Sequence, residues 1–354
     1  ALAEQRQVPA LTYGDPLLYV MWTAATTTTA LALATAVTFF IWRAAQWFSS
    51  VDAESHFEAS QHFLEDPNSF EKVPPPSIFA EATKSLSVVI PAYNEEDRLP
   101  VTLEDLIGYL SHRRDTQDAN FTYEIIIVDD GSRDNTSGIA FDYVRKYSFE
   151  AVRVIRFSRN MGKGGAVKAG MMIARGRQLL MADADGATRI SDLAKLEAVM
   201  HNVTDPGAAQ STRAFQQQSE LGMVIGSRAH MQQAAVNKRA WHRNLLMRGF
   251  HLLVMMVIGD KVKDTQCGFK LFTRRAARSL YKNQRIKRWC FDVELIYLAQ
   301  ELHIPVREVD VEWREVPGSK IRVTSMINMA MELLAVLLGY KVFRRWLIKT
   351  EAEA

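Results

Sequence analysis

The feature that most constrains the fold of this chain is a series of short apolar runs, each of which ends in a cluster of polar residues. The runs lack the alternation of apolar and polar residues that marks a half-buried strand, so we expect strands buried on both faces. Helical stretches separate them, which predicts an α/β fold with a mostly parallel sheet flanked by helices. The first four runs are Ser87–Ala92, Tyr123–Val128, Val152–Phe157 and the run that begins at Leu179.

The fourth run ends in the sequence Asp183-Ala184-Asp185-Gly186. Residues two apart in a strand point to the same side, so both carboxylates can reach one cation at the frayed end of this strand. Hard cations such as Mg²⁺ and Mn²⁺ take oxygen ligands, and Mg²⁺ is usually bound together with substrate phosphates. The pair therefore predicts a metal–diphosphate site, although an Asp-x-Asp triplet taken alone also occurs in ordinary solvated turns.

The three earlier runs also end in polar clusters, and each cluster alone has a plain structural interpretation. Pro91–Glu96 could be a strand exit, and Asp129–Ser132 an ordinary turn. Gly162–Gly165 lacks the spacing of a Walker loop and could be a flexible linker. Ligands of open α/β sheets bind outside the carboxyl ends of the strands, and all four clusters occupy that position. Their joint occurrence favours one ligand site along this edge.

Composition indicates an ordinary folded protein. The chain has 354 residues, of which 48% are hydrophobic, enough for one large domain or two small ones with a sizeable core. A formal net charge of +3 is too small to argue for nucleic acid, so no nucleic acid partner is expected; the basic residues of the last third suit an anionic lipid surface. The two cysteines, Cys267 and Cys290, provide neither a disulfide framework nor a zinc site and are interpreted as small buried hydrophobic residues.

An uncharged stretch lies near the start of the sequence. No charged residue occurs between Asp15 and Arg43, and Leu17–Trp42 is long enough, as a helix, to cross a hydrocarbon core of roughly 30 Å. We expect a transmembrane anchor here. The alternative is a cleaved signal peptide, which would have a shorter apolar core followed by a small-residue cleavage site.

Three sequons indicate on which side of the membrane the main domain lies. Asn120, Asn135 and Asn202 each begin an Asn-x-Ser/Thr triplet that would accept a glycan in a lumen. Asn135 lies among the clusters of the expected ligand site, where a glycan would block binding. We therefore expect the main domain to face the cytosol.

The sequence predicts four segments along the chain: 1–48 with the anchor at about 17–42, a connector at 49–85, the main domain at 86–320, and a C-terminal segment at 321–354. Within the main domain, 201–220 is polar and is interpreted as a mobile surface insertion.

Two helices are expected to lie in a membrane interface. Residues 241–258 have the periodicity of an interfacial helix, although a core helix fits nearly as well. Residues 321–348 form a long apolar helix that contains Asn328 and Glu332. Because both residues would be costly in a membrane crossing, we expect amphipathic helices on the membrane surface.

The order of the motifs resembles a known family. The sequences IPAYNEE, VDDGSRDNT, RNMGKGGAVKAGM, LLMADADGAT, VIGSR and DTQCGFKLF are similar to those of family-two inverting glycosyltransferases of GT-A fold, which glycosylate polyprenyl phosphates. The resemblance covers about 86–320. DADGAT, GKGGAVKAGM and the single anchor look most like members that glucosylate dolichyl phosphate at the endoplasmic reticulum membrane for N-glycan assembly. The resemblance implies UDP-glucose as donor, dolichyl phosphate as acceptor and the lipid bilayer as a further partner.

The resemblance also implies roles for individual residues. The metal, Mg²⁺ or Mn²⁺, would be bound by Asp183, Asp185 and Gln266, and the implied catalytic residues are Asp185, Gln266 and Arg228. Uridine and ribose would be held by Pro91, Tyr93, Glu95, Asp129 and Asp130, with Lys163 nearby. The acceptor phosphate would be bound by Arg228, Arg243 and Lys320. The Gln-x-x-Arg-Trp signature of processive members is absent after Gln266, which implies transfer of a single sugar.

The expected chemistry is displacement at the anomeric carbon of the sugar, with UDP as leaving group. A phosphate monoester has a second pKa of about 6, is largely dianionic at neutral pH and needs no general base. We hypothesise that Arg228 and Arg243 position it; alternatively, they are surface cations in contact with lipid. Asp292 could serve as a base, but Phe291 and Val293 beside it suit a helix packed under the site.

Other functions remain open at this stage. GDP-mannose is the alternative donor within the family. A nucleotidyltransferase tethered to a membrane but acting on a soluble substrate also needs a metal–diphosphate site. Its chemistry would need neither the paired amphipathic helices nor the anchor. An inactive binding scaffold is expected to have lost a carboxylate, and this sequence has lost none.

Overall fold

The computed structural model divides the chain into two compact units, Ala1–Glu54 and Ser55–Ala354. Most of the predicted anchor at 17–42 lies outside the residues that the structure describes. Lys320 and positions 205–219 of the predicted insertion also lie outside them. Within the described part of the chain, no helix is both long and apolar enough to cross a membrane. The described residues are 27–28, 34–35, 38, 64–69, 72–204, 220–232, 241–260, 262–316 and 323–350.

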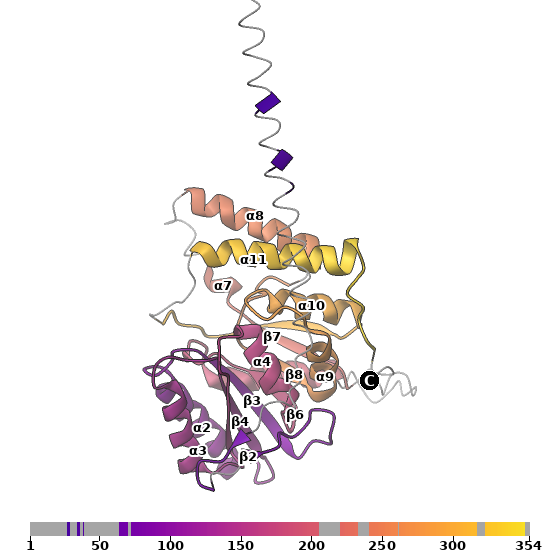
Figure 1. Ribbon diagram of the computed structural model, residues 1–354. Coiled ribbons are helices and arrows are strands. Elements are labelled where there is room, and N and C mark those ends of the chain that lie inside the picture. Colours follow the sequence, from indigo (N-terminus) through magenta and orange to yellow (C-terminus); the bar gives the residue numbers. More distant parts are fainter. Residues whose placement is uncertain are drawn as a thin grey trace, which may run out of the picture. The chain divides into compact units, whose positions relative to one another are not determined.

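A seven-stranded sheet forms the centre of the second unit (Figure 1). The strand order is β5-β4-β3-β6-β8-β7-β9, and β8 is antiparallel to both of its neighbours while all other pairs are parallel. The mostly parallel sheet predicted from the sequence is confirmed. The strands are β3 (Lys84–Ala92), β4 (Tyr123–Asp129), β5 (Val152–Arg156), β6 (Gly176–Met181), β7 (Met223–Ser227), β8 (Lys270–Thr273) and β9 (Val306–Asp310).

The strands form where apolar side chains fill consecutive positions, because helices cover both faces of the sheet. Every residue of β4 is buried, and so are most residues of β3. The predicted strands at 87–92 and 123–128 lie within these two elements. The last strand, β9, ends at Asp310, and Trp313 beyond it forms an isolated bridge with Thr188.

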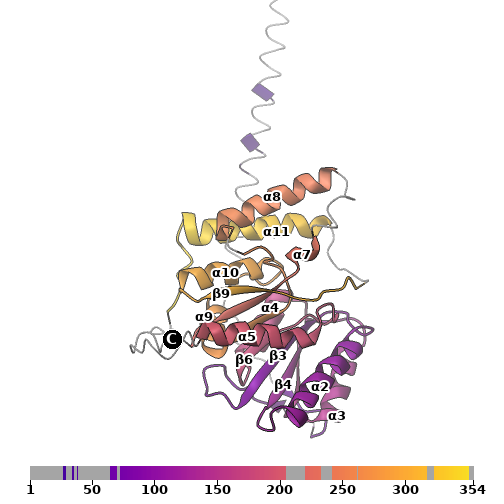
Figure 2. The same ribbon diagram turned by 180° about the vertical axis from the view of Figure 1, so that it is seen from behind.

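Helices cover the sheet in two layers. One face carries α2 (Leu99–Thr116), α3 (Thr136–Tyr147) and α5 (Leu193–Thr204), which lie in front in Figure 2. The opposite face carries α4 (Lys163–Met172), α9 (Arg274–Asn283) and α10 (Phe291–Glu301). The short elements are β1 (Leu64–Glu65), β2 (Lys72–Val73), η2 (Ile190–Asp192) and α7 (Ala229–Gln232).

A further pair of helices packs beyond α10. The helices α8 (Trp241–Ile258) and α11 (Val323–Val336) contact each other and lie on the side of α10 away from the sheet (Figures 1 and 2). The bounds predicted for α8 are confirmed. Glu332 of α11 is buried, and its carboxylate accepts hydrogen bonds from the N–H groups of Trp289 and Cys290 at 3.1 and 2.8 Å. The acidic residue of this apolar helix therefore faces the protein.

The helix predicted at 321–348 is confirmed for most of its length but ends earlier than predicted. The helix α11 passes into a π-helical segment, η4 (Leu337–Val342), and ends there. Trp346, which is 3% exposed, then folds back against Tyr340 with ring centroids 5.1 Å apart. Gly339 permits this contact, because an added Cβ would lie 2.5 Å from the Trp346 ring. Burial of one aromatic ring thus ends the helix where the apolar pattern continues.

Candidate active site

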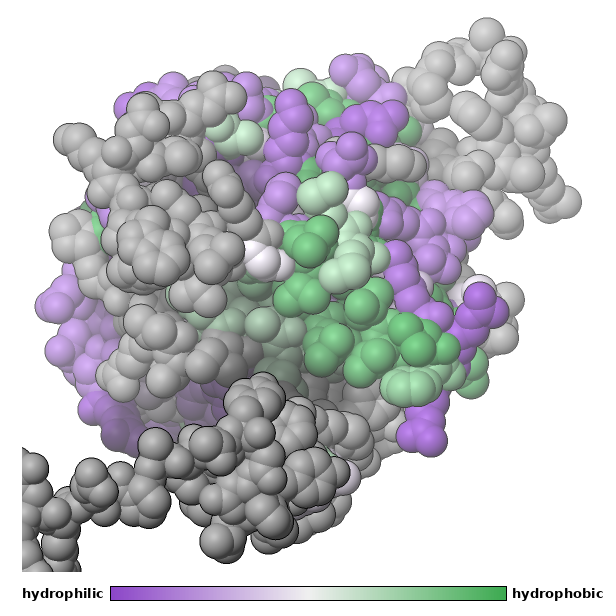
Figure 3. Space-filling view, turned by 90° about the horizontal axis from the view of Figure 1, so that it is seen from above, coloured by the Kyte–Doolittle hydropathy of each residue, from purple (hydrophilic) through white to green (hydrophobic). Residues whose placement is uncertain are grey.

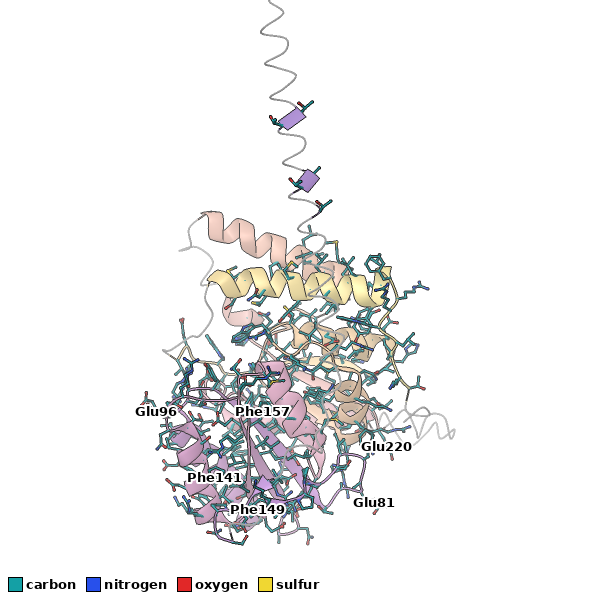
Figure 4. The ribbon with its side chains drawn as sticks, in the orientation of Figure 1. Glu81, Glu96, Phe141, Phe149, Phe157 and Glu220 are labelled. Atoms are coloured by element: carbon teal, nitrogen blue, oxygen red, sulfur yellow. The ribbon has the colours of Figure 1, made fainter. Side chains whose placement is uncertain are left out.

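The ligand edge of the sheet is the one where its parallel strands end. In Figure 4, Glu96 and Phe157 lie at this edge, just after β3 and β5, whereas Glu81 and Phe149 lie at the opposite edge. Because β8 runs in reverse, its first residue, Lys270, and the turn before it also lie at the ligand edge. The four polar clusters predicted from the sequence meet there, joined by the turn before β8.

Asp183 is the most firmly held of the predicted metal ligands. Lys163, the first residue of α4, places its Nζ 2.6 Å from Asp183 Oδ1. Burial opposes both charges, but this ion pair outweighs burial, so that the pKa of Asp183 is lowered and the pKa of Lys163 is raised. Gly268 lies directly against the carboxylate, since an added Cβ would be 2.0 Å from Asp183 Oδ2. Asp183 is therefore ionised and fixed from two sides.

Asp185 follows two residues later, and its Oδ1 accepts a hydrogen bond from Ala187 N at 3.0 Å. The side chains of Asp183 and Asp185 are 34% and 28% exposed, which leaves their oxygens accessible to a cation. Gln266, the third predicted ligand, is half-buried and lies two residues before Gly268. Two carboxylates and an amide oxygen suit a hard divalent cation. No group of three or more His, Cys, Asp and Glu side chains is placed to hold a metal among the described residues.

Asp129 and Asp130, where β4 ends, hold the loops around them. Asp130 accepts hydrogen bonds from the N–H groups of Met161 and Gly162 at 2.5 and 2.9 Å. Burial raises the pKa of Asp130 to about 6, although these bonds favour the charged form. Asp129 accepts a hydrogen bond from Ser132 N at 2.9 Å. The two carboxylates thereby fix the loop after β5 and the loop after β4.

The loops after β3 and β4 are also joined to each other. Asn94, in the left-handed conformation with φ +53°, donates its N–H to Ser132 Oγ at 2.9 Å. Its side-chain Oδ1 accepts a hydrogen bond from Arg133 N at 2.8 Å. The N–H of Glu95 donates to Thr136 Oγ1 at 2.7 Å. The residues predicted to bind the nucleoside therefore lie at the ends of β3 and β4 and in the two loops that follow, which together form one connected wall.

Arg98 is a site residue that the sequence analysis missed. Its Nε and Nη2 donate to the two carboxylate oxygens of Glu95, each at 2.7 Å. Its Nη1 lies 4.0 Å from Asp185 Oδ2. Arg98 thus links a residue predicted to bind the nucleoside to a predicted metal ligand. A signal was present, because opposite charges three residues apart can pair across a single turn of the chain, as they do here just before α2.

The Gly-rich start of α4 is used for packing. The N–H groups of Gly164 and Gly165 donate to the backbone carbonyls of Arg288 and Lys287 at 3.1 and 2.7 Å. Amides at a helix N-terminus commonly bind phosphate, but the loop between α9 and α10 already uses these two. An added Cβ at Gly164 would lie 2.8 Å from the carbonyl oxygen of Ile286. The glycines therefore allow α4 to approach that loop closely.

Of the three cations predicted to bind the acceptor phosphate, only the side chain of Arg228 lies within the described part. Its Nε and Nη2 donate to Asp264 at 2.7 and 2.9 Å, and its guanidinium lies 5.5 Å from the ring centroid of Trp313. Arg243 belongs to α8, and its side chain, like Lys320, lies outside the described residues. The phosphate-binding role of these cations stays a prediction.

A second ion pair is buried behind the first. Lys270 is fully buried and places its Nζ 2.5 Å from Asp292 Oδ1 and 2.5 Å from the carbonyl oxygen of Cys267. Burial raises the pKa of Asp292, against the lowering influence of Lys270 and Lys163. Asp292 therefore lies in a helix packed under the site, and its ion pair holds the turn that carries Gly268.

Comparison with known proteins agrees with this geometry. The model of glycosyl transferase family 2 matches residues 87–281. The chain belongs to this family. It is 46% identical to the dolichyl-phosphate beta-glucosyltransferase of Homo sapiens over 75% of this chain and 78% of that protein. The proteins of the same name from Dictyostelium discoideum and Saccharomyces cerevisiae are 43% and 41% identical, over 75% and 72% of this chain and 77% and 75% of theirs.

Membership in the family confirms the predicted glycosyltransferase class, and the sheet with its helix layers has the GT-A-like arrangement.

One face of this glycosyltransferase is apolar. Figure 3 views the molecule from above, and apolar side chains gather on this face. We name its exposed members the apolar face; they are Leu252, Met255 and Met256 of α8, together with Val342 and Phe343 beside Lys341, which donates to the carbonyl oxygen of Met256.

Proposed function

We propose that this chain transfers glucose from UDP-glucose to dolichyl phosphate with inversion, giving dolichyl β-D-glucosyl phosphate for N-glycan assembly. The observation that carries the proposal is the arrangement of Lys163, Asp183 and Asp185 at the ligand edge. It occurs in a chain 46% identical to a protein named for this activity. Ionised carboxylates beside a fixed ammonium group suit a leaving diphosphate and its cation.

The donor would lie across the ends of β3, β4 and β6. Uridine and ribose would contact the wall formed by the ends of β3 and β4 and the loops after them, where Pro91, Tyr93, Glu95, Asp129 and Asp130 lie. The reason is that these loops are fastened to each other before any ligand binds, so little ordering entropy is lost on binding. Lys163, in the next loop, would face the diphosphate.

Asp183, Asp185 and Gln266 would bind Mg²⁺ or Mn²⁺. Such a cation, when bound, neutralises the negative charge that develops on the leaving phosphate. Lys163 supplies a further positive charge at the same place, and its ion pair keeps the Asp183 carboxylate turned toward the ligand. Gly268 closes the other side of this carboxylate with backbone alone.

The acceptor is a phosphate monoester, which is largely dianionic at neutral pH and attacks without a general base. Attack from the face opposite UDP gives the inverted, β-linked product. Arg228, with Arg243 and Lys320, would orient the phosphate through charge-assisted hydrogen bonds. Asp264 supports this role by holding two nitrogens of the Arg228 guanidinium in place.

The isoprenoid chain of the acceptor requires the site to work beside a bilayer. The apolar face would rest against the endoplasmic reticulum membrane, with the anchor at 17–42 crossing it and the main domain in the cytosol. Three exposed cations of the C-terminal segment support this orientation, because they lie next to the apolar residues in the sequence and suit anionic headgroups. They are Lys341, Arg344 and Arg345.

The proposal is tested with purified protein in detergent, dolichyl phosphate and radiolabelled UDP-glucose, with Mg²⁺ and then with excess chelator. We expect a glucosyl lipid whose formation stops with chelator, and a β-linkage by NMR. Asp185→Asn should abolish this product, while Asp118→Asn, an exposed residue at the opposite edge, should retain it.

Three other results would change the conclusion. A mannosyl lipid from GDP-mannose, without glucosyl lipid, would overturn the donor. No lipid product from either donor would indicate the tethered nucleotidyltransferase that acts on a soluble substrate. Full turnover of Arg228→Ala at saturating acceptor would remove Arg228 from the acceptor site.

A further inference from the structure

The loop between α9 and α10, residues 284–290, is held firmly beside the active site. Two buried carboxylates accept hydrogen bonds from its backbone, Glu294 of α10 at 2.7 to 3.0 Å and Glu332 of α11 at 2.8 to 3.1 Å. From within the loop, Gln284 Nε2 donates to the carbonyl oxygen of Gly164 at 3.0 Å. These contacts fix the backbone of the loop to three helices, so the point from which each side chain leaves the loop is set by the fold.

Arg288 is the residue of this loop whose side chain lies against Gly162, beside the donor site. An added Cβ on Gly162 would lie 2.9 Å from Arg288 Cγ. Gly162 itself donates its N–H to Asp130 at 2.9 Å, and the following residue is Lys163. The Arg288 side chain therefore begins between a carboxylate that we assign to the nucleoside and the ammonium group that we assign to the diphosphate.

The guanidinium of Arg288 is a charge without a partner among the described residues. Its side chain is exposed, and no hydrogen bond or ion pair joins its guanidinium to another described group. It acts on two buried carboxylates at a distance, since it opposes the rise in pKa that burial causes at Asp130 and Glu332. Backbone N–H groups already satisfy both. The cation thus lies between the donor site and α11, open to a ligand.

We propose that Arg288 binds a phosphate group of a reacting substrate. The planar, permanently charged guanidinium suits phosphate oxygens, and a fixed backbone reduces the entropy lost when it binds. Two substrates of the proposed reaction carry such a group, the donor as a diphosphate and the acceptor as a monoester. The inference rests on the proposed function and adds a residue that neither the motifs nor the predicted acceptor cations include.

The test compares Arg288→Gln with Lys287→Gln, which removes the same charge from the adjacent residue of the loop. Initial rates are measured with UDP-glucose varied at saturating dolichyl phosphate, and then with dolichyl phosphate varied. UDP affinity is measured separately by calorimetry. Loss of one charge-assisted contact should raise one KM roughly 10- to 100-fold. Thermal unfolding confirms that both variants are folded, and Arg288→Lys should recover part of the loss.

The two KM values and the UDP affinity show which phosphate group Arg288 binds, or that it binds neither. A higher KM for UDP-glucose with weaker UDP binding places Arg288 on the diphosphate, and a higher KM for dolichyl phosphate alone places it on the acceptor. Unchanged KM values, or equal effects of Arg288→Gln and Lys287→Gln, overturn the proposal. If the wild-type protein forms no glucosyl lipid, the proposed function is wrong. The UDP affinity still tests Arg288 in that case, because an unchanged affinity in Arg288→Gln would overturn a contact with the diphosphate.

Discussion

Replacing Gly268 by alanine tests whether the placement of Asp183 controls turnover. The added Cβ would lie 2.0 Å from Asp183 Oδ2, whereas ordinary van der Waals contact begins at 3.4 Å. Relief therefore requires a displacement of about 1.4 Å, shared between the carboxylate and the turn that carries Gly268. A misplacement of about 1 Å at a reacting site can lower the rate about 100-fold, which corresponds to about 2.7 kcal/mol of activation free energy.

We expect kcat/KM for UDP-glucose to fall about 100-fold in Gly268→Ala. The free energy of unfolding should fall by only about 1–3 kcal/mol, from local overpacking. Gly165→Ala is the matched control, because its Cβ would lie 3.3 Å from the Met161 side chain and alanine favours the helix there. Radiolabel transfer gives kcat/KM, and chemical denaturation gives the unfolding free energy. Wild-type kcat/KM in Gly268→Ala would refute the argument that Asp183 must stay in place.

Arg98, Asp130 and Arg274 each allow a further test. Arg98→Ala should raise the KM for UDP-glucose and the metal concentration for half-maximal rate about tenfold. Arg113→Ala, which removes the ion pair that the last turn of α2 makes with Glu197, should change neither. Burial raises the pKa of Asp130 to about 6. Between about pH 4 and 6, the folded protein therefore keeps a proton on Asp130 that the unfolded chain has lost. The wild type should therefore lose stability relative to Asp130→Asn as the pH rises. The difference between their unfolding free energies should fall by about 2 kcal/mol from about pH 4.5 to 6.5, measured by denaturation. A difference that stays constant would contradict this. Arg274 donates to four backbone carbonyls at the edge opposite the site, so Arg274→Ala should lose about 3 kcal/mol of unfolding free energy with unchanged KM, whereas Arg275→Ala should lose little.

The parallel part of the sheet could be predicted because its strands are buried on both faces and carry uninterrupted apolar runs. The rule that ligands bind at the carboxyl ends of such strands then placed Asp130 and Asp183 at one edge, where the structure has them. The direction of β8 could not be predicted in the same way, since no local pattern distinguishes a parallel strand from an antiparallel one. Its reversal brings Gln266 and Gly268 to the ligand edge, and only the family resemblance had assigned Gln266 to the site.

Buried charged residues could likewise be predicted only in part from the sequence. An acidic residue within an apolar helix, such as Glu332 or Asp292, is visible in the sequence as an exception. Its partner is not visible, because Glu332 binds backbone N–H groups about 40 residues away, at Trp289 and Cys290. The cysteines gave a simpler prediction, and the burial of Cys290 and its companion is confirmed. Arg98 was recoverable from spacing, but Lys270 was not, since its partner Asp292 lies in another element.

Glu332 offers a test of how the layer that bears the apolar face supports the active site. Its carboxylate accepts the N–H groups of Trp289 and Cys290, and the same loop accepts the N–H groups at the start of α4, where Lys163 pairs with Asp183. Glu332→Ala would leave two N–H groups without an acceptor, at a cost of about 1–3 kcal/mol each. We expect faster hydrogen exchange at 284–290 and in the first turn of α4, together with lower kcat/KM.

Glu332→Gln is the matched variant, because an amide oxygen can still accept both hydrogen bonds. It should keep the exchange rates and the turnover of the wild type, which separates the hydrogen bonds from the charge. Exchange at the opposite edge of the sheet, near Arg274, should be the same in all three proteins. If Glu332→Ala loosens the loop while kcat/KM stays at the wild-type value, the loop does not control the position of Lys163, and its contacts with α4 serve stability alone.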